Sequence, residues 1–393
     1  MNGAGRSGGS NGNHGNGGDR GTRREFLRTA AIAAAIAGFG GGALAAAGGK
    51  KKDKHGGKGM TILILGGTKF LGPAVVEAAM KRGHTLTLFN RGKTNPGLFP
   101  DVEKLQGDRD GNLKALEGRR WDAVVDTSGY VPRIVRDSAT LLKESGQYVF
   151  ISTLSVYSDG KTPNQDESGP VAILKDPTVE KVDGETYGGL KALCEEAADQ
   201  AMPGKVARIR PGLIVGPEDP TDRFTYWPVR VARGGETLAP GTPDDPAQMI
   251  DVRDLGEWTV KVIEDKALGI YNAVSPPFGM GKMLEACNQA GGGKATFTWA
   301  DAAFLEEQKV AAWSDMPVWV PPAGDEGGFS RFSSAKAVAR GLTFRSITDT
   351  SKATLEWFRT EPAERQAKLK AGLTAEREVE VLAAWHARQP AKG

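Results

Sequence analysis

A tyrosine and a lysine four residues apart are the best candidates in this chain for acid–base chemistry. Tyr187 and Lys191 lie in the run Glu185-Thr-Tyr-Gly-Gly-Leu-Lys191, which predicts a helix with both side chains on one face. A phenol has a pKa of about 10 and is a poor base at neutral pH, but an ammonium one turn away favours the phenolate. Chance also produces such pairs, so the elements that position this one decide its meaning.

The run Thr61-Ile-Leu-Ile-Leu-Gly-Gly-Thr-Lys-Phe-Leu-Gly72 predicts an apolar strand that turns at glycines into a helix. Such a turn directs free backbone N–H groups and the positive end of a helix dipole at one point, which suits a pyrophosphate. We therefore expect a dinucleotide to contact this turn. The residues expected to contact it are Gly66, Thr68, Lys69, Phe70 and Leu71. A tight turn without a ligand is the alternative, because a glycine-rich turn alone is weak evidence.

Four further strands are predicted before the tyrosine, with helical stretches between most of them. They are expected over residues 84–89, 102–108, 121–126 and 147–153. Strand–helix alternation at this spacing predicts an α/β fold with a doubly wound parallel sheet. Ligands of such sheets bind beyond the carboxyl ends of the strands, and Thr153 closes the fifth strand there.

The end of the second strand discriminates between dinucleotides. Asn90, Arg91 and Lys93 stand where a carboxylate would bind the ribose hydroxyls of NAD, and the cations favour the 2′-phosphate of NADP. We therefore expect NADP, with NAD as the alternative cofactor. Asp108 closes the third strand and is expected to accept a hydrogen bond from adenine. A solvated basic turn and a plain turn aspartate are the structural alternatives.

Together these segments resemble the extended short-chain dehydrogenase/reductases, the NAD-dependent epimerase/dehydratase family. The matching motifs run in the family's order over about residues 60–345: Gly66–Gly72, Phe150–Tyr157, Tyr187–Lys191, Arg208–Pro217 and Ile250–Leu255. The resemblance implies a Rossmann domain at 60–210 and a smaller C-terminal substrate lobe at 211–393. It also implies that Tyr187 is the general acid/base, that Lys191 binds the nicotinamide ribose and that Thr153 orients a substrate hydroxyl.

Two departures from the family pattern bear on function. Lys69 replaces the usual second glycine, as in a subgroup that includes chloroplast stem-loop RNA-binding proteins, so a non-catalytic nucleotide-binding protein with an RNA or protein partner is the alternative function. Leu154 and Ser155 stand where family dehydratases carry an acid and a base. Epimerisation or simple redox chemistry is therefore favoured over dehydration.

The region beyond residue 210 is expected to hold the substrate. Arg223, Trp227 and Arg253 are the candidate contacts for a sugar and a diphosphate, which would make the substrate a nucleotide sugar. A packed surface loop is the alternative for this aromatic segment. A homodimer is among the assemblies that this interpretation allows.

The front of the chain resembles a twin-arginine export signal. Arg23 and Arg24 precede an Ala/Gly-rich apolar stretch that ends near Ala47, after a Gly/Asn/Ser-rich start that predicts disorder. This predicts export through the twin-arginine translocase, cleavage and a periplasmic or other extracytoplasmic location. An uncleaved membrane anchor is the alternative. Residues 48–59 are expected to be a linker.

Charge and composition narrow the partners further. The whole chain has a net charge of +3, but residues 1–58 hold ten basic and three acidic side chains, so the remainder is at −4. A mildly acidic body argues against a broad nucleic-acid surface. Two cysteines and four histidines form no ligand pattern, so no metal site is expected.

Overall fold

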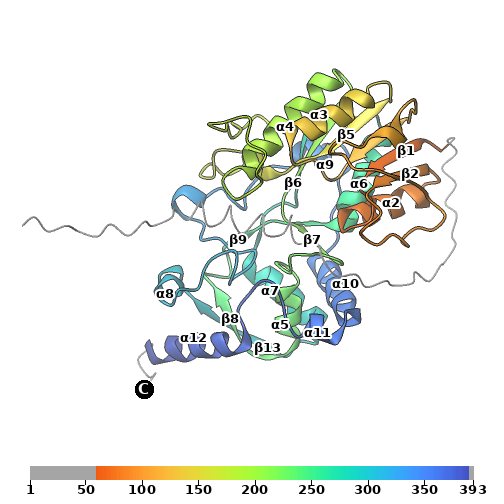
Figure 1. Cartoon of the computed structure of the whole chain (residues 1–393). Helices are drawn as coiled ribbons and strands as arrows, with labels where there is room; N and C mark the ends of the chain where they lie inside the picture. The colour runs from red at the N-terminus through yellow and green to blue at the C-terminus, as the bar shows by residue number, and fades with distance from the viewer. Residues whose placement is uncertain (1–58, 389–393) are drawn as a thin grey trace, which may run out of the picture.

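The computed structural model describes residues 59–388, so the export signal and most of the linker lie outside the described residues. Its centre is a seven-stranded parallel sheet in the order β11-β6-β5-β4-β1-β2-β3 (Figure 1). The strands are β1 (Thr61–Leu65), β2 (Thr85–Asn90), β3 (Glu103–Gln106), β4 (Ala123–Asp126), β5 (Gln147–Ile151), β6 (Val206–Pro211) and β11 (Gly269–Ala273). The predicted doubly wound sheet and its first five strands are confirmed.

Helices cover both faces of the sheet, which is why its central strands are apolar along their length. Helices α2 (Leu71–Lys81) and α6 (Val252–Glu264) pack together on one face, where they bury Ile62 and Ile64 of β1. Helices α3 (Pro132–Leu141) and α4 (Tyr187–Ala201) pack on the other, where the alternate residues Leu63 and Leu65 lie. Alternating side chains of a strand point to opposite faces, and here both faces are buried.

The strand order reverses at β1. From β1 the chain goes outward through β2 and β3, and then returns to add β4, β5 and β6 on the other side. A crevice forms at the carboxyl ends of the strands at such a switch point. The sequence places its glycine turn and Thr153 at this edge.

The second body of the molecule contains a separate hydrophobic core below the sheet (Figure 1). Strands β8 (Gly235–Pro240) and β13 (Ala295–Ala300) pair in parallel beside its helices. The helices of this body are α5 (Tyr226–Ala232), α7 (Met280–Gly291), α8 (Ala302–Glu307), α10 (Ile347–Thr360), α11 (Ala363–Gln366) and α12 (Ala375–Arg388). We call it the lower lobe.

The chain crosses between the two bodies more than once. Helix α6, β11 and α9 (Ala335–Ala339) belong to the sheet body although they follow residue 210, so the predicted boundary there is only approximate. Short two-stranded pairs join the bodies. They are β7 (Ile214–Val215) with β10 (Ile250–Asp251) and β9 (Pro246–Ala247) with β12 (Phe278–Gly279). Single 3-10 turns lie at Lys114–Leu116, Leu154–Val156 and Gly324–Glu326.

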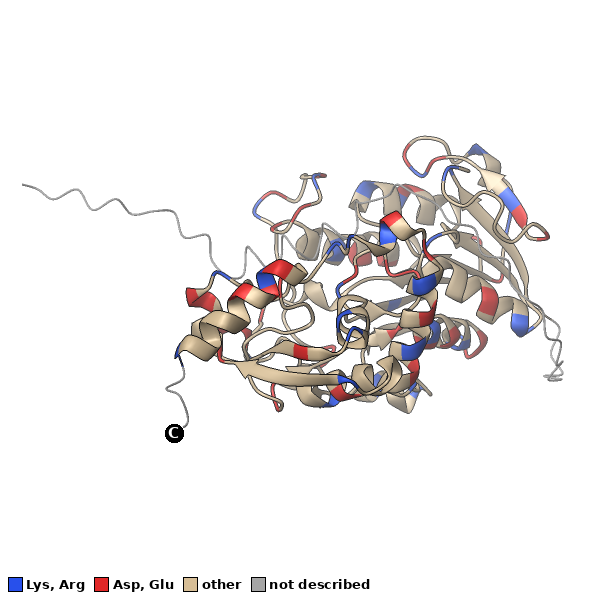
Figure 2. Ribbon diagram, turned by 90° about the horizontal axis from the view of Figure 1, so that it is seen from below, with Lys and Arg blue, Asp and Glu red and all other residues tan. Residues whose placement is uncertain are grey.

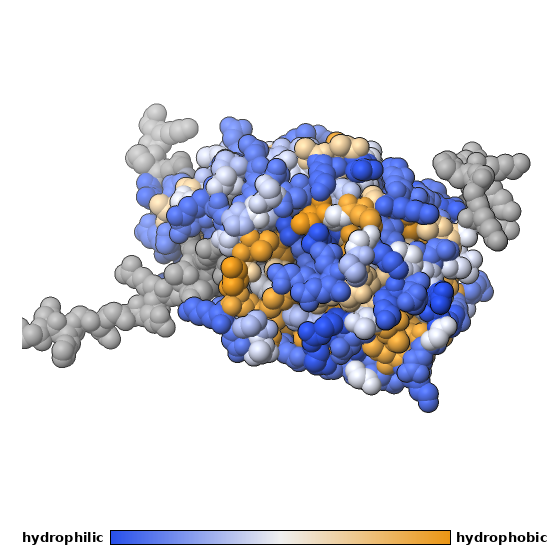
Figure 3. Space-filling model, turned by 90° about the horizontal axis from the view of Figure 1, so that it is seen from above, coloured by the Kyte–Doolittle hydropathy of each residue, from blue (hydrophilic) through white to orange (hydrophobic). Residues whose placement is uncertain are grey.

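The surface is mixed in character. Seen from below, basic and acidic residues alternate along the visible helices, strands and loops (Figure 2). Seen from above, the surface is mostly hydrophilic, with apolar residues gathered in a few patches (Figure 3). Within residues 59–388, no helix combines the length and the apolar character needed to cross a membrane.

Candidate active site

Two adjoining cavities open at the carboxyl ends of the strands. The larger, of about 610 Å³, lies between the glycine turn after β1 and the ends of β2 to β5, and we call it the dinucleotide cavity. The smaller, of about 280 Å³, lies between the end of β5 and loops of the lower lobe, and we call it the second cavity. Both are lined by Phe70, Ser152, Tyr187, Ile214 and Pro220. Tyr187 is therefore at the boundary between the two cavities.

The turn after β1 has the backbone that its glycines predict. Gly66 and Gly67 have φ angles of +111° and +92°, which other residues rarely adopt. A Cβ on Gly72 would lie 2.6 Å from the carbonyl carbon of Gly67, so helix α2 packs directly on the turn. Phe70 precedes α2 at a φ of 49° and lines both cavities. Positive φ at a bulky residue is strained, and such strain is concentrated at binding sites.

The remaining predicted residues of the turn also line the dinucleotide cavity. They are Thr68, Lys69 and Leu71. Burial is the main cause that lowers the pKa of Lys69, with a further contribution from the charge of Lys370. Lys69 is nevertheless an exposed residue, so this cation lies at the solvent side of the cavity.

The ends of β2 and β3 contribute polar groups with different roles. The Asn90 amide donates to the carbonyl of Gly66 at 3.2 Å and its oxygen accepts from the Gly92 N–H at 2.9 Å, so this side chain fixes the two turns together. Arg91 and Lys93 line the dinucleotide cavity and are exposed. Asp108 also lines it, with one carboxylate oxygen accepting from the N–H of residue 110 at 3.1 Å.

Lys191 is fixed in the floor of the dinucleotide cavity. Its Nζ donates to the carbonyl oxygens of Gly129 at 2.6 Å and Ile151 at 2.7 Å, and it lies 4.2 Å from the ring centroid of Phe150. Burial lowers the pKa of this ammonium to about 8. An ammonium has three donors, and these two bonds leave the third for a ligand.

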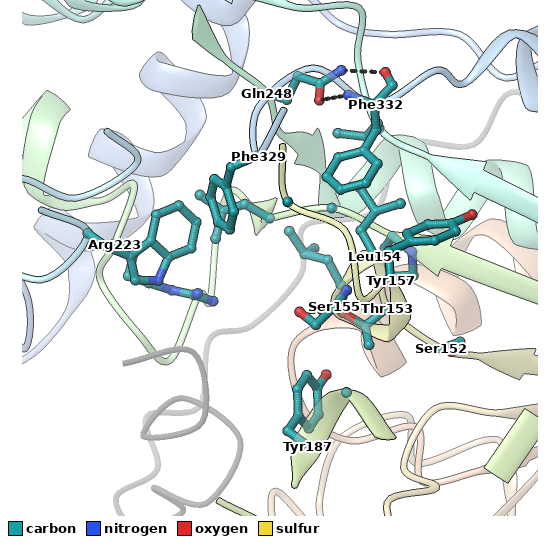
Figure 4. Close-up of a pocket in the computed structure, with 18 of the residues that line it drawn as sticks. Ser152, Thr153, Leu154, Ser155, Tyr157, Tyr187, Arg223, Gln248, Phe329 and Phe332 are labelled. Atoms are coloured by element: carbon teal, nitrogen blue, oxygen red, sulfur yellow. Dashed lines mark hydrogen bonds between the residues drawn. The ribbon is translucent and has the colours of Figure 1, made fainter. Parts of the chain in front are cut away.

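Tyr187 begins helix α4 and lines the second cavity together with Thr153, which caps the 3-10 turn after β5 (Figure 4). Burial raises the pKa of the phenol, and the nearby Thr153 hydroxyl and the positive charge of Arg223 act against that rise. The sequence predicts Lys191 as the cation that tunes Tyr187. In the structure the positive charge of Arg223, on the far side of the second cavity, acts against the rise. The predicted role of Lys191 stays a prediction, and its ammonium donates to the two backbone carbonyls described above.

The second cavity is lined mostly by apolar and aromatic side chains, and Figure 4 shows several of them around Tyr187 and Arg223. These side chains are Leu154, Tyr157, Leu213, Val274, Trp313, Phe329 and Phe332. The Arg223 guanidinium lies 5.4 Å from the ring centroid of Trp313. Arg223 is thus the predicted substrate residue that lines the same cavity as Tyr187.

The other two predicted substrate residues lie away from both cavities. Trp227 is completely buried in the core of the lower lobe, where its indole N–H donates to the carbonyl of Pro317 at 2.7 Å. Arg253 forms ion pairs with Asp251 at 2.6 Å and Asp349 at 3.1 Å at the start of α6. Their positions correct the sequence prediction, because packing and local ion pairs account for both side chains.

A buried ion pair beneath the dinucleotide cavity was not predicted. Arg109 donates two hydrogen bonds to Asp126, at 2.6 and 2.7 Å, and a third to Ser138 at 2.8 Å. The Tyr148 hydroxyl also donates to Asp126, at 2.7 Å. The pairing joins β4 to the loop after β3, and the only signal in the sequence is a carboxylate that ends an otherwise apolar strand.

Comparisons with known proteins agree with this architecture. No model of a known protein family matches the chain. A chloroplast stem-loop binding protein of 41 kDa from Arabidopsis thaliana is 26% identical over 291 residues, which cover 66% of this chain and 73% of that protein. An epimerase family protein from Bos taurus is 25% identical over 236 residues, which cover 55% and 75% of the two chains.

Solved structures share the same backbone arrangement over most of their length. The UDP-N-acetylglucosamine 4-epimerase from Bacillus cereus superposes with a TM-score of 0.56 at 17% identity, over 77% of this chain and 98% of that one. The Bordetella bronchiseptica enzyme WbmH, solved with NAD+, gives a TM-score of 0.57 at 16% identity over 77% and 99%. The chain has the fold of these epimerases. At such identity the likeness establishes the Rossmann-like fold, while the reaction has to be argued from the site.

Proposed function

We propose that this chain is an NADP-linked oxidoreductase or epimerase that acts at a hydroxyl-bearing carbon of a small molecule. The observation that carries the proposal is the position of Tyr187 between a cationic cavity and a second, apolar one. Thr153 lines the second cavity with it, and Lys191 follows one helical turn later. Solved structures with the same fold include NAD complexes and UDP-sugar 4-epimerases.

The dinucleotide cavity fits a nicotinamide cofactor. The glycine turn offers its backbone to a pyrophosphate, Lys191 keeps one donor for a ribose, and Arg91 with Lys93 suits a 2′-phosphate. Ser152 Oγ, between the two cavities, is buried without a hydrogen-bond partner among the described residues, as expected where a ligand supplies one. When bound, the nicotinamide would accept or return a hydride.

The chain's own residues then handle the proton. Thr153 and Tyr187 hold the substrate hydroxyl between them, and Tyr187 takes its proton as a hydride leaves the carbon. Arg223 stabilises the phenolate that performs this step. Since Leu154 and Ser155 replace the acid and base of dehydratases, we favour epimerisation or simple redox over loss of water.

The first test replaces Tyr187 with phenylalanine. We expect Tyr187→Phe to bind NADP as the unaltered chain does and to lower kcat by about 10²–10⁴-fold, the usual size of general acid–base catalysis. Binding is measured by isothermal titration and turnover by nicotinamide absorbance, with a panel of secondary alcohols and their ketones. Turnover that survives the replacement would sink the assignment of Tyr187.

The preference for NADP has its own test. Arg91→Asp replaces a cation with a carboxylate that accepts from ribose hydroxyls, so NADP affinity should fall while NAD affinity holds or rises. Arg136→Asp is the matched control, because Arg136 is exposed on α3 and lines neither cavity. Tighter binding of NAD than NADP by the unaltered chain would exclude the preference.

A non-catalytic nucleotide-binding protein with an RNA or protein partner is the second candidate, because a relative is titled as a stem-loop binding protein. The net charge of −4 on the chain beyond residue 58 weighs against RNA. A gel-shift assay with stem-loop RNA separates the two. Salt-sensitive RNA binding, together with unchanged activity of Tyr187→Phe, would favour this candidate.

We also propose export by the twin-arginine route, on the strength of Arg23 and Arg24 ahead of an apolar stretch. The replacement of both arginines by lysine should retain the protein in the cytoplasm of the expressing bacterium. Cell fractionation with an activity or antibody readout measures this, and N-terminal sequencing of the exported form shows whether the signal is cleaved.

A further inference from the structure

The two cavities differ sharply in charge. Among the described residues, the dinucleotide cavity is lined by the cations Lys69, Arg91, Lys93, Arg109 and Lys191 and the carboxylates Asp108 and Asp110. The second cavity is lined by the single cation Arg223 and the carboxylates Asp159 and Glu326. The phosphates of one dinucleotide therefore find several cations in the first cavity, whereas the lining of the second offers one, which matches a single carboxylate better than a diphosphate.

The size and the lining of the second cavity also favour a ligand smaller than a nucleotide sugar. At about 280 Å³ the second cavity is roughly twice an engineered cavity of about 150 Å³ that binds benzene in another protein. Aromatic side chains form much of its wall, among them Trp313, Phe329 and Phe332. Such a volume suits one ring with a short substituent, whereas a nucleotide sugar also carries a base, a ribose and two phosphates.

Arg223 is a donor without a full set of partners. Its Nε donates to Thr221 Oγ1 at 3.1 Å, and among residues 59–388 it forms no ion pair, although the fully buried carboxylate of Asp219 acts on it at longer range. Burial lowers the pKa of this guanidinium, and the charge of Asp219 partly offsets that fall. Beside it, Trp313 Nε1 is buried without a hydrogen-bond partner among the described residues. Both donors are suited to one anionic acceptor.

We propose that the second cavity binds a compact, largely apolar hydroxy acid or keto acid with a single carboxylate, in place of a nucleotide sugar. The carboxylate binds Arg223, the apolar part packs on Trp313 and Phe329, and the hydroxyl carbon lies at Tyr187. This inference rests on the proposed function. In the oxidative direction the C–H bond releases its hydride to oxidised nicotinamide, the O–H proton passes to Tyr187, and a ketone is left.

The experiment compares ligands on the full chain loaded with NADP. Isothermal titration is run with 3-hydroxy-3-phenylpropanoate, its neutral counterpart 1-phenylethanol, and UDP-glucose. We expect the acid to bind about 10- to 100-fold more tightly than the neutral alcohol, the usual effect of a hydrogen bond to a charged group. Tighter binding of UDP-glucose than of the acid would overturn the proposal, and this comparison needs no variant.

Two variants test whether Arg223 is the group that binds the carboxylate. Arg223→Gln should reduce the affinity for the acid to that for the neutral alcohol. The affinity for 1-phenylethanol should stay unchanged. Arg233→Gln is the matched control, since Arg233 is an exposed arginine at the end of α5 that lines neither cavity. Equal losses for both ligands in Arg223→Gln would contradict the proposal. Thermal unfolding of the ligand-free variants verifies that both remain folded.

The two proposals fail in different ways. If the acid binds through Arg223 but NADP supports no turnover of any ligand, the substrate chemistry stands and the proposed reaction fails. If NADP-dependent turnover occurs with UDP-glucose but not with the acid, the reaction stands and this inference fails.

Discussion

At the boundary of the two cavities, some neighbours of Tyr187 raise the pKa of its phenol and others lower it. Burial raises the pKa of its phenol, while the nearby Thr153 hydroxyl and the charge of Arg223 lower it. A tyrosine base needs a low pKa to work near neutral pH. The cations beside it and any positive charge on the bound cofactor therefore determine whether the phenolate forms, and Arg223 is the cation that the chain itself supplies.

Loss of Arg223 should be visible in the pH dependence of turnover. In the oxidative direction activity rises with pH as Tyr187 deprotonates, and removal of a positive charge raises the pKa of that step. We expect the rising limb of kcat in Arg223→Gln to move to higher pH, with about a tenfold loss at neutral pH for each unit of displacement. The same limb in Arg233→Gln should coincide with that of the unaltered chain. An unmoved limb in Arg223→Gln would mean that this charge does not act on the phenol.

Lys191 makes a separate prediction about stability. Burial lowers its pKa to about 8 in the folded chain, against about 10.4 in an unfolded one. Between these values the unfolded chain binds more protons, so the free energy of unfolding should rise with pH across this window. Lys191→Met removes the titration and should flatten the rise by on the order of 1–3 kcal/mol between pH 7 and 10. Urea unfolding of the cofactor-free proteins at several pH values measures this free energy. If it depends on pH in the same way in Lys191→Met and in the unaltered chain, Lys191 is not a buried ammonium with a lowered pKa.

At the scale of elements, the strand β1, its turn and helix α2 act as one unit. Gly72 allows α2 to pack against the turn, since a Cβ there would lie 2.6 Å from the carbonyl carbon and 2.7 Å from the Cα of Gly67. Both contacts are with backbone, which cannot move aside as a flexible side chain would. The position of α2, and with it the free N–H groups of its first turn, depends on this close approach.

Gly72→Ala should therefore weaken both stability and cofactor binding. We expect a loss of about 1–3 kcal/mol in the free energy of unfolding, typical of overpacking, together with a weaker affinity for NADP. Gly97→Ala is the control, because a Cβ at Gly97 would meet open space and its φ is an ordinary one. That variant should stay within about 0.5 kcal/mol of the unaltered chain. An unchanged NADP affinity in Gly72→Ala would show that helix α2 can move away from the turn without loss of cofactor binding.

The elements also show what sequence alone can predict. Strands β1, β4 and β5 are predictable because burial on both faces demands continuous apolar runs, and Tyr187 with Lys191 is predictable because helical spacing is local. The return of β11 to the sheet depends on contacts between distant parts of the chain, which local pattern does not encode. The same limit applies to Trp227. An aromatic residue in a loop of mixed character fits a ligand wall and a core equally well, and only its packing against Pro317 distinguishes them.

At the scale of the whole molecule, the C-terminal segment holds the loop that carries Arg223. The fully buried carboxylate of Asp222 accepts from Arg365 at 2.5 Å and from the N–H of Lys370 at 2.8 Å. The Lys370 ammonium donates to the carbonyl of Pro220 at 2.9 Å. Residues some 150 positions apart in the chain thus fix one wall of the second cavity, while the dinucleotide cavity is lined mainly by the sheet body.

Asp222→Ala should therefore affect ligand binding in the second cavity but not in the dinucleotide cavity. The change leaves Arg365 without its partner and should lower the free energy of unfolding by about 3 kcal/mol, as for a broken buried ion pair. Because the wall beside Arg223 loosens, we expect the hydroxy acid to bind more weakly, whereas NADP affinity stays unchanged. Glu380→Ala is the control, since its pair with Arg377 is exposed and contributes less than about 1 kcal/mol. Titration of both ligands into the two variants measures this, and a parallel loss of NADP and acid would mean that the cavities form a single cooperative unit.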